Sequence, residues 1–197
     1  LKEAIGGDNR AAYLRTHVWS PEERAAVLAL GSDDGVKVWI NGDQVHANNV
    51  SRGCTPGEDE VAVRLAAGWN TVLMKIVQGS GGWGACLQVR SPDGAPMLDA
   101  RAAHAPKNET EAPPLADTEG NVMVWDVAGP FSKDGVPGAE LFDVAFAPEN
   151  GEDAEWRPMP TAPKERQPCP WLLLDNGVME VRGGGIVSKE RFLDHKV

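Results

Sequence analysis

The feature that most constrains the fold is an Asn-Gly pair, Asn41-Gly42, which directly follows the segment VKVWI at residues 36–40. That segment alternates with the period of two that is typical of a strand. Asn and Gly both tolerate positive φ angles, and an Asn-Gly pair between β-rich segments is the strongest short hairpin signal. The chain is therefore expected to return as a second strand at residues 44–46.

Further strand patterns surround this hairpin between about residues 11 and 90. The expected extended segments are residues 13–19, 25–30, 60–65, 71–77 and 86–90. Short strands at such regular spacing are typical of a β-sandwich. The 22 glycines and 15 prolines of the chain also favour many turns over long helices. We expect an all-β protein whose residues 1–90 form a jelly-roll β-sandwich.

The remaining chain changes character twice. Residues 91–121 hold five prolines and almost no bulky apolar residue, which predicts a Pro-rich surface linker. Residues 122–170 start apolar again at residues 122–125 and end in a polar, Pro-rich stretch at residues 149–170. They either begin a second module or supply strands that complete the first. Residues 171–197 contain three short strand-like pieces, too few to build a core unaided. The part after the linker is thus expected to be an incomplete β segment.

Three motifs together resemble a known module. They are GSDDGVKVWING at residues 31–42, GWNT at residues 68–71 and GGWG at residues 81–84. They resemble a galactose-binding-like jelly-roll module of secreted, planctomycete-type glycan-active proteins, and are similar to the sugar-binding jelly rolls of family 2 glycosidases. The resemblance covers about residues 11–90. It implies an exported, periplasmic or extracellular module that binds a polysaccharide or oligosaccharide and is not an enzyme.

Two later segments carry further resemblances. WDVAGPF at residues 125–131 is similar to the opening of the same module, but here it follows the linker, so the order departs from that family. Residues 176–194 resemble the opening strands of the 3-keto-disaccharide hydrolase family, which has a concanavalin-like sandwich. Only about thirty residues at the end of the chain are covered, and the family's catalytic region is not among them. A neighbouring hydrolase domain is the partner that this resemblance implies.

Asp33 and Asp34 are the candidate metal ligands. Adjacent carboxylates in a turn, together with amide or backbone oxygens, suit Ca²⁺, which takes six to eight oxygen ligands. The pair also resembles the adjacent aspartates that hold calcium in protective-antigen-type lectin domains. The alternative is that both residues only shape the turn, because an Asp side chain bonds its own following backbone.

The candidate sugar ligands are Asn48, Asn49, Arg52 and Trp83. The first three offer amide and guanidinium groups to sugar hydroxyls, and Trp83 stands in a glycine-rich loop where its ring could stack on a pyranose. The alternative for Trp83 is a plug over the end of the sandwich. Two other tryptophans, Trp39 and Trp69, lie in or beside apolar strands and are expected in the core.

Charge and motifs exclude several classes of function. A net charge of −10 repels phosphate backbones, so nucleic acid is not an expected partner. No apolar run approaches the roughly 18 residues that span a bilayer, and neither an HExxH motif nor a GxSxG elbow is present. The sequence opens without Met, which is typical of an excerpt or a processed chain, so an export signal is expected to lie outside it.

The three cysteines, Cys54, Cys86 and Cys169, have no CxxC spacing, which argues against zinc. A Cys54–Cys86 disulfide and a pair of buried thiols are both compatible with the sequence. The leading hypothesis is a non-catalytic carbohydrate-binding module. The alternatives are a structural repeat of a surface fibre, whose partners are copies of itself, and a fragment of a glycoside-cleaving hydrolase.

Overall fold

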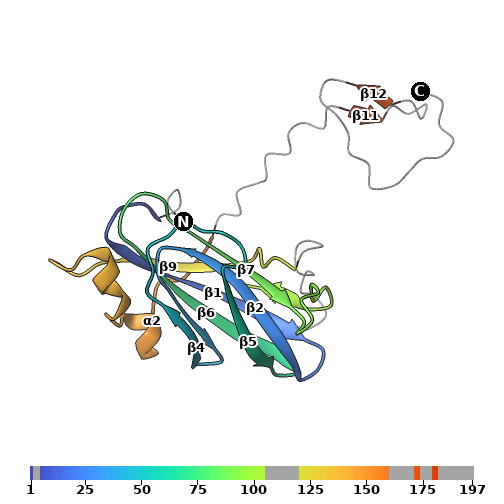
Figure 1. Ribbon diagram of the computed structural model, residues 1–197, viewed down its shortest axis with the longest axis horizontal. Coiled ribbons are helices and arrows are strands. Elements are labelled where there is room, and N and C mark those ends of the chain that lie inside the picture. Colours follow the sequence, from blue (N-terminus) through green and yellow to red (C-terminus); the bar gives the residue numbers. More distant parts are fainter. Residues whose placement is uncertain (2–4, 105–119, 160–170, 174–178, 182–197) are drawn as a thin grey trace. The chain divides into compact units, whose positions relative to one another are not determined.

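The computed structural model describes residues 1, 5–104, 120–159, 171–173 and 179–181. The chain divides into two compact units, Leu1–Pro160 and Thr161–Val197. The first unit consists of two antiparallel sheets that face each other, as Figure 1 shows. The prediction of an all-β sandwich is confirmed.

The large sheet has the strand order β10-β9-β1-β6-β3-β4, with β8 also paired to β1. Its strands are β1 (Arg10–Ser20), β3 (Val36–Ile40), β4 (Asp43–Asn48), β6 (Gly68–Gln78), β8 (Arg101–Ala103), β9 (Asp126–Phe131) and β10 (Arg157–Pro158). The long central strands β1 and β6 pair over their whole length, from Arg10↔Gln78 to Ser20↔Gly68. The other edge of β1 is shared by β8 and β9.

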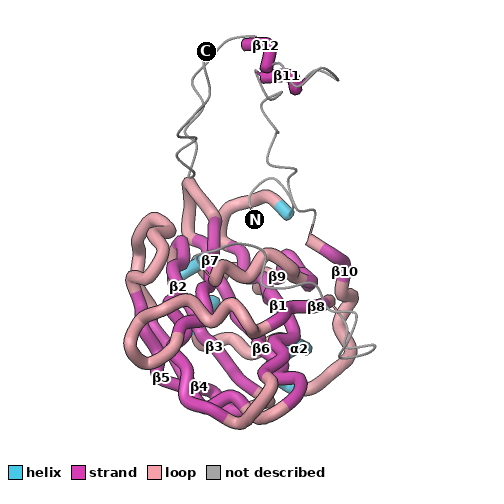
Figure 2. Tube along the Cα trace, turned by 90° about the vertical axis from the view of Figure 1, so that its right-hand side faces the viewer, coloured by secondary structure: helices cyan, strands magenta, loops and turns pink. Residues whose placement is uncertain are grey.

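The small sheet has the order β5-β2-β7. Its strands are β2 (Arg24–Asp33), β5 (Asp59–Leu65) and β7 (Gly84–Arg90). Figure 2 shows these strands forming a layer separate from β1, β3 and β6. Residues 120–122 extend this sheet at β7, because Val89 N–H donates to Gly120 O at 3.0 Å and Val122 N–H donates to Leu87 O at 2.9 Å.

The predicted hairpin is present as β3 and β4. Asn41 and Gly42 both have positive φ angles, 52° and 92°. The Asn41 side chain also ties the turn to β6, since its Oδ1 accepts from Thr71 N–H at 2.9 Å and its Nδ2 donates to Asn70 Oδ1 at 3.0 Å. The turn is therefore fixed to the neighbouring strand as well as by its backbone preference.

Alternation along the strands decides which side chains enter the core. In β3, Val36, Val38 and Ile40 are buried between the sheets, whereas Lys37 and Trp39 lie on the opposite side. The same parity puts Leu28 and Leu30 of β2 in the core. The outer face of the large sheet is thus a surface with its own aromatic and charged residues.

Residues 91–104 depart from the linker prediction. Met97, Ala100 and Ala102 are at most 5% exposed and belong to the main core. The backbone turns back onto β7 through Met97 N–H, which donates to Val89 O at 3.0 Å, and β8 then pairs with β1. A few small apolar side chains suffice to close this edge of the sandwich, so composition alone misled the prediction. Residues 105–119 lie outside the described residues.

Residues 122–159 supply strands to the first unit, which is the second of the two alternatives drawn from the sequence. β9 pairs with β1, and β10 pairs with β9. Between them, residues 138–156 form what we call the cover segment, with the 3-10 helix η1 (Gly138–Phe142) and the short helix α2 (Ala147–Asn150). Its Leu141 and Phe142 pack against Ala11 and Val77, on the outer face of the large sheet.

The second unit contains β11 (Trp171–Leu173) and β12 (Met179–Val181), which pair antiparallel. These strands agree with two of the three pieces expected near the end of the chain. The third, at residues 186–187, lies outside the described residues. Among the helices that the structure describes, none is long and apolar enough to cross a membrane.

Candidate functional site

The predicted calcium pair lies in the turn between β2 and β3. Asp34 Oδ1 accepts from Ser51 Oγ at 3.2 Å and from the backbone N–H of Arg52 at 3.1 Å. Its Oδ2 accepts from Gly79 N–H at 2.9 Å. Asp34 therefore joins two loops to the turn, and both of its carboxylate oxygens have protein donors.

Asp33 lies beside the glycine-rich loop. A Cβ atom on Gly82 would stand 2.3 Å from Asp33 Oδ2, so only glycine fits there without movement. No group of three or more His, Cys, Asp or Glu side chains suited to a metal occurs in the described part of the chain. Calcium at Asp33 and Asp34 stays a prediction.

Arg52 is bound to the sandwich through most of its guanidinium. It donates from Nε to Ser32 O at 3.3 Å and from Nη2 to Ser32 Oγ at 3.0 Å, and it also donates to Asp59. The hydrogen bond with Asp59 raises the pKa of Arg52. Burial by itself would raise the pKa of the Asp59 carboxyl. The hydrogen bonds from Arg52 and Asn48 outweigh that effect, so the pKa of Asp59 is lowered.

The predicted sugar ligands divide into three groups. Asn48 donates to Asp59 Oδ1 at 3.0 Å and so belongs to the Arg52 network. Asn49 is exposed and reaches the carbonyl of Ala139 at 3.5 Å, in the cover segment. Trp83 is 5% exposed and packs in the main core, which agrees with the plug alternative and leaves no open ring face for a sugar. The network of Asn48 and Arg52 thus serves the protein's own loops.

A cavity of about 430 Å³ lies on the other side of the molecule, between the outer face of the large sheet and the cover segment. We call it the outer cavity. Its lining residues are Arg15, Trp39, Gly42, Thr71, Leu73, Pro148, Glu149, Gly151, Glu152, Asp153, Ala154 and Trp156. Two tryptophans, several carboxylates, a hydroxyl and a guanidinium thus face one space.

Both tryptophans are held in place without belonging to the core. Trp39 lies on β3 opposite Leu73 of β6, on the outer face. The Trp156 ring stacks on the guanidinium of Arg15, with 4.1 Å from Cζ to the ring centroid. Arg15 in turn pairs with Asp126 at 3.4 Å. Neither tryptophan is a member of the two hydrophobic clusters that the described residues form.

A buried cation fixes the cover segment above the sheet. Lys75 of β6 has a fully buried side chain, and its Nζ lies 2.8 Å from Glu149 Oε1. Nζ also donates to the carbonyls of Phe142 at 3.0 Å and Val144 at 2.6 Å. Glu149 accepts a further hydrogen bond from the Tyr13 hydroxyl. We call Lys75, Glu149 and Tyr13 the clamp.

The pKa values of two clamp residues, Lys75 and Tyr13, are shifted in opposite directions. Burial lowers the pKa of Lys75, and the bond to Glu149 only partly offsets that loss of hydration. Burial, with the hydrogen bond to Glu149, raises the pKa of Tyr13. At neutral pH Tyr13 is thus a hydroxyl donor, and Glu149 is oriented by two partners at the rim of the outer cavity.

Sequence reasoning missed both aromatic walls of this cavity. Trp39 was expected in the core, but its parity in β3 is that of Lys37 and not that of Val36 and Val38. That parity was the signal that could have placed it outside. Trp156 stands in a polar, Pro-rich stretch, and no local pattern indicates that it returns to the large sheet.

Comparison with protein-family models, with curated proteins and with solved structures gave no match for this chain. The function is therefore inferred from the residues of the outer cavity and from their geometry.

Proposed function

We propose that this chain is a non-catalytic carbohydrate-binding module that recognises its glycan in the outer cavity. The observation that carries the proposal is the pairing of Trp39 and Trp156 in one cavity with Arg15, Thr71 and acidic side chains. Ligand sites combine apolar, aromatic walls with a few polar groups that fix orientation. A pyranose presents the same combination, an apolar ring face and a rim of hydroxyls.

The polar groups of the cavity suit hydroxyl recognition. Glu152 and Asp153 are exposed and can accept hydrogen bonds from sugar hydroxyls, while Thr71 can both donate and accept. These groups line the same cavity as both indole rings, so they would orient a sugar stacked there. The clamp supports this use, because it holds the chain segment that carries Glu152, Asp153 and Trp156 against the sheet.

Charge narrows the class of glycan. Arg15 is paired with Asp126, and Glu149 with Lys75, so among the described residues that line the cavity the charges outside an ion pair are those of Glu152 and Asp153. A uronic acid or sulfated sugar would be repelled there. The proposed ligand is therefore a neutral glycan or one that carries free amino groups.

Affinity gel electrophoresis with a panel of neutral, amino-bearing and acidic polysaccharides tests the proposal. Trp156→Ala should weaken retardation by a bound glycan roughly 5- to 30-fold, as expected for a lost stacking contact of about 1–2 kcal/mol. Trp69→Ala is the matched control, because Trp69 is half-buried on β6 but does not line the cavity. Equal loss in both variants, or no retardation of the full chain by any glycan, would refute the proposal.

The carboxylates also favour a second candidate, the fragment of a glycoside-cleaving hydrolase. Glu149, Glu152 and Asp153 line one cavity, and glycoside hydrolysis uses two carboxyl groups roughly 5–10 Å apart. The test is product analysis after prolonged incubation with each glycan that binds. Release of oligosaccharide that is lost in Glu152→Gln would favour this candidate over simple binding.

A further inference from the structure

The small sheet carries a pair of thiols that the proposed function does not use. Cys54 lies in the loop of residues 49–58, which we call the crossing loop, and Cys86 lies on β7. Their sulfurs are 3.7 Å apart, with the Cys54 thiol donating to Cys86. Both residues are half-buried. The two sulfurs come from positions 32 residues apart in the sequence and are in direct contact.

This contact depends on a glycine beneath the crossing loop. Gly31 of β2 pairs with Cys86 across the sheet. A Cβ atom on Gly31 would stand 2.1 Å from Thr55 O and 3.1 Å from Cys86 Sγ. The loop can therefore cross the outer face of the small sheet at this point only because residue 31 has no side chain.

The crossing loop is also tied down on the N-terminal side of Cys54. The backbone N–H of Arg52 donates to Asp34 Oδ1 at 3.1 Å, and its guanidinium bonds to Ser32. On the C-terminal side of Cys54 the loop is braced internally, since Thr55 N–H donates to Glu58 Oε2 at 3.1 Å. Cys54 is thus held beside Cys86 by contacts that do not involve either sulfur.

The two thiols differ in acidity. The hydrogen bond from the Cys54 thiol lowers the pKa of Cys86 to about 7, with help from the Gly31 backbone and the Arg52 charge. The same interaction and burial raise the pKa of Cys54. Cys86 is therefore the sulfur expected to be a thiolate near neutral pH, and a thiolate is the attacking species in disulfide exchange.

We propose that Cys54 and Cys86 form a reversible disulfide that fastens the crossing loop to β7 when the protein meets a small-molecule or protein disulfide. The Cys86 thiolate attacks one sulfur of that reagent, forms a mixed disulfide and releases the first reagent thiolate. Cys54 then loses its proton and attacks Cys86 Sγ, which releases the second thiolate. Two protein thiols are oxidised, one reagent disulfide is reduced, and the protons pass to the released thiolates.

The bond would close a loop that contains β5 and β6, including the long strand at the centre of the large sheet. Cross-linking across such a loop restricts the unfolded chain and stabilises the folded one. The disulfide is independent of glycan binding, because Cys86 lies on the small sheet, Cys54 lies in the loop that crosses it, and neither lines the outer cavity.

The test uses the full chain with Cys169→Ser, which removes the third thiol as a competing partner. The protein is treated with oxidised glutathione and, separately, with a dithiol reductant. We expect oxidation to lower the intact mass by two hydrogens and to raise the melting temperature by about 5–10 °C. Digestion of the oxidised protein should yield a linked peptide pair that contains Cys54 and Cys86 and that separates on treatment with the dithiol reductant.

A kinetic measurement checks the division of roles. With limiting iodoacetamide the reduced protein should be alkylated first at Cys86, and Cys54→Ala should raise the apparent pKa of that reaction because it removes the thiol that donates to Cys86. Two titratable thiols that persist after exposure to oxidised glutathione, or a cross-link that leaves the melting temperature unchanged, would overturn the proposal. Glutathione retained on Cys86 without the internal bond would overturn it equally.

Discussion

The two outer faces of the sandwich are covered in different ways. The small sheet is crossed by the loop of residues 49–58, which lies next to its own strands in the sequence, and the anchoring cation, Arg52, keeps contact with solvent. The large sheet is covered by residues 138–156, which arrive from far along the chain, and the anchoring cation, Lys75, is fully buried. The first cover is close in sequence to the sheet it crosses and its cation is partly exposed, whereas the second comes from a distant part of the chain and its cation is buried.

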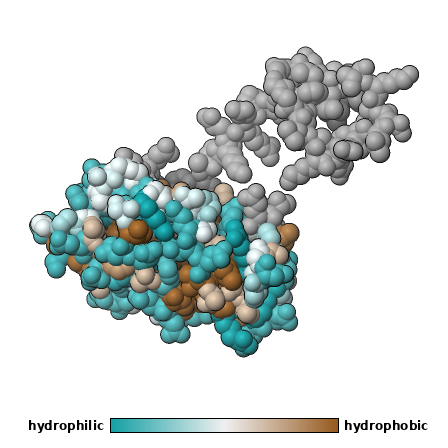
Figure 3. Space-filling view, in the orientation of Figure 1, coloured by the Kyte–Doolittle hydropathy of each residue, from teal (hydrophilic) through white to brown (hydrophobic). Residues whose placement is uncertain are grey.

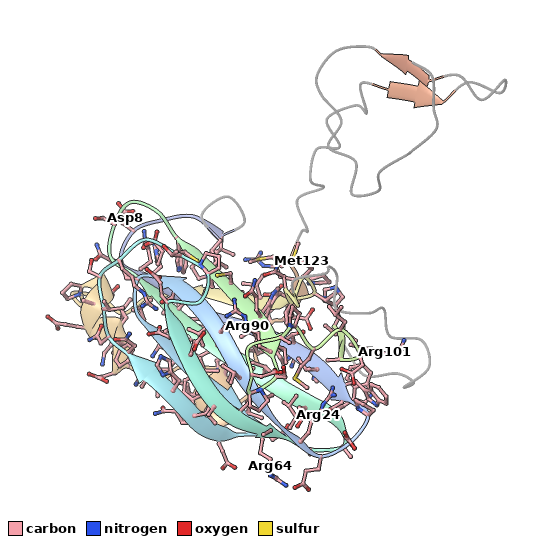
Figure 4. All side chains as sticks on the ribbon, turned by 45° about the vertical axis from the view of Figure 1, so that its right-hand side comes forward. Asp8, Arg24, Arg64, Arg90, Arg101 and Met123 are labelled. Atoms are coloured by element: carbon pink, nitrogen blue, oxygen red, sulfur yellow. The ribbon has the colours of Figure 1, made fainter. Side chains whose placement is uncertain are left out.

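Because the two faces are covered differently, the outer face of the large sheet has a cavity of the kind that binds a ligand. Figure 3 shows the first unit as mainly hydrophilic on the side turned to the viewer, with separate hydrophobic patches. Along the small sheet the arginines have nearby carboxylates, as in Arg24–Asp99 at 2.7 Å and Arg90–Glu60 at 3.3 Å, and Figure 4 labels both arginines. The cover of the large sheet instead leaves the outer cavity with two indole rings. A distant segment, laid over a sheet, creates a cavity that a local loop does not.

The largest effect is expected from removing the buried cation. Lys75→Met should lower the free energy of unfolding by about 3–5 kcal/mol, because it leaves Glu149 and two carbonyls without their partner in a buried site. Urea denaturation measures this loss. Lys37→Met is the matched control, since Lys37 lies on the same face but pairs with the exposed Asp143 at 3.4 Å, and it should cost less than about 1 kcal/mol. Equal losses would remove the distinction between the two covers.

A smaller effect is expected at the two glycines on which the covers rest. A Cβ atom on Gly138 would stand 2.0 Å from Gln78 O, and one on Gly31 would stand 2.1 Å from Thr55 O. Each Gly→Ala substitution should cost about 1–3 kcal/mol, as overpacking does. The two substitutions should also differ in which property they change, glycan binding or thiol oxidation. Gly138→Ala should weaken glycan retardation but spare Cys54–Cys86 oxidation, and Gly31→Ala should do the reverse.

The same contrast shows what the sequence could and could not predict. The β3–β4 hairpin was predictable because Asn41-Gly42 and the alternation beside it are local signals. The Asp34 and Arg52 region was recognised as special, although its polar groups turn out to bind one another. The cover segment and Trp156 could not be placed, because their partners, Lys75 and Arg15, are fixed by tertiary packing over long sequence separations.

Acid should weaken the cover of the small sheet through Asp59. The pKa of Asp59 is lowered from its ordinary value of 3.8 in the folded protein. Between the folded and the ordinary pKa, the Asp59 carboxyl therefore binds a proton more readily in the unfolded chain than in the folded one. The stability that Asp59 contributes is therefore complete above about pH 5 and is lost as the pH falls through the folded pKa. Asp59→Asn should cost about 0.5–1 kcal/mol at pH 7 and flatten the acid limb of a melting-temperature profile. An unchanged acid limb in this variant would contradict the assignment.

The smallest effect is expected from calcium. Asp34 already accepts three hydrogen bonds from protein donors, so an ion at Asp33 and Asp34 must replace them or share the same oxygens. A site of millimolar affinity would raise the melting temperature by about 2 °C in a few millimolar calcium. Differential scanning fluorimetry in calcium and in chelator measures this shift. Asp34→Asn separates the two roles, because it should lower stability in chelator by unfastening the loops and should also abolish the calcium increment. If calcium still raises the melting temperature of Asp34→Asn, the ion binds at another site. If calcium does not raise the melting temperature of the unaltered chain, the role of Asp34 is only to hold the crossing loop.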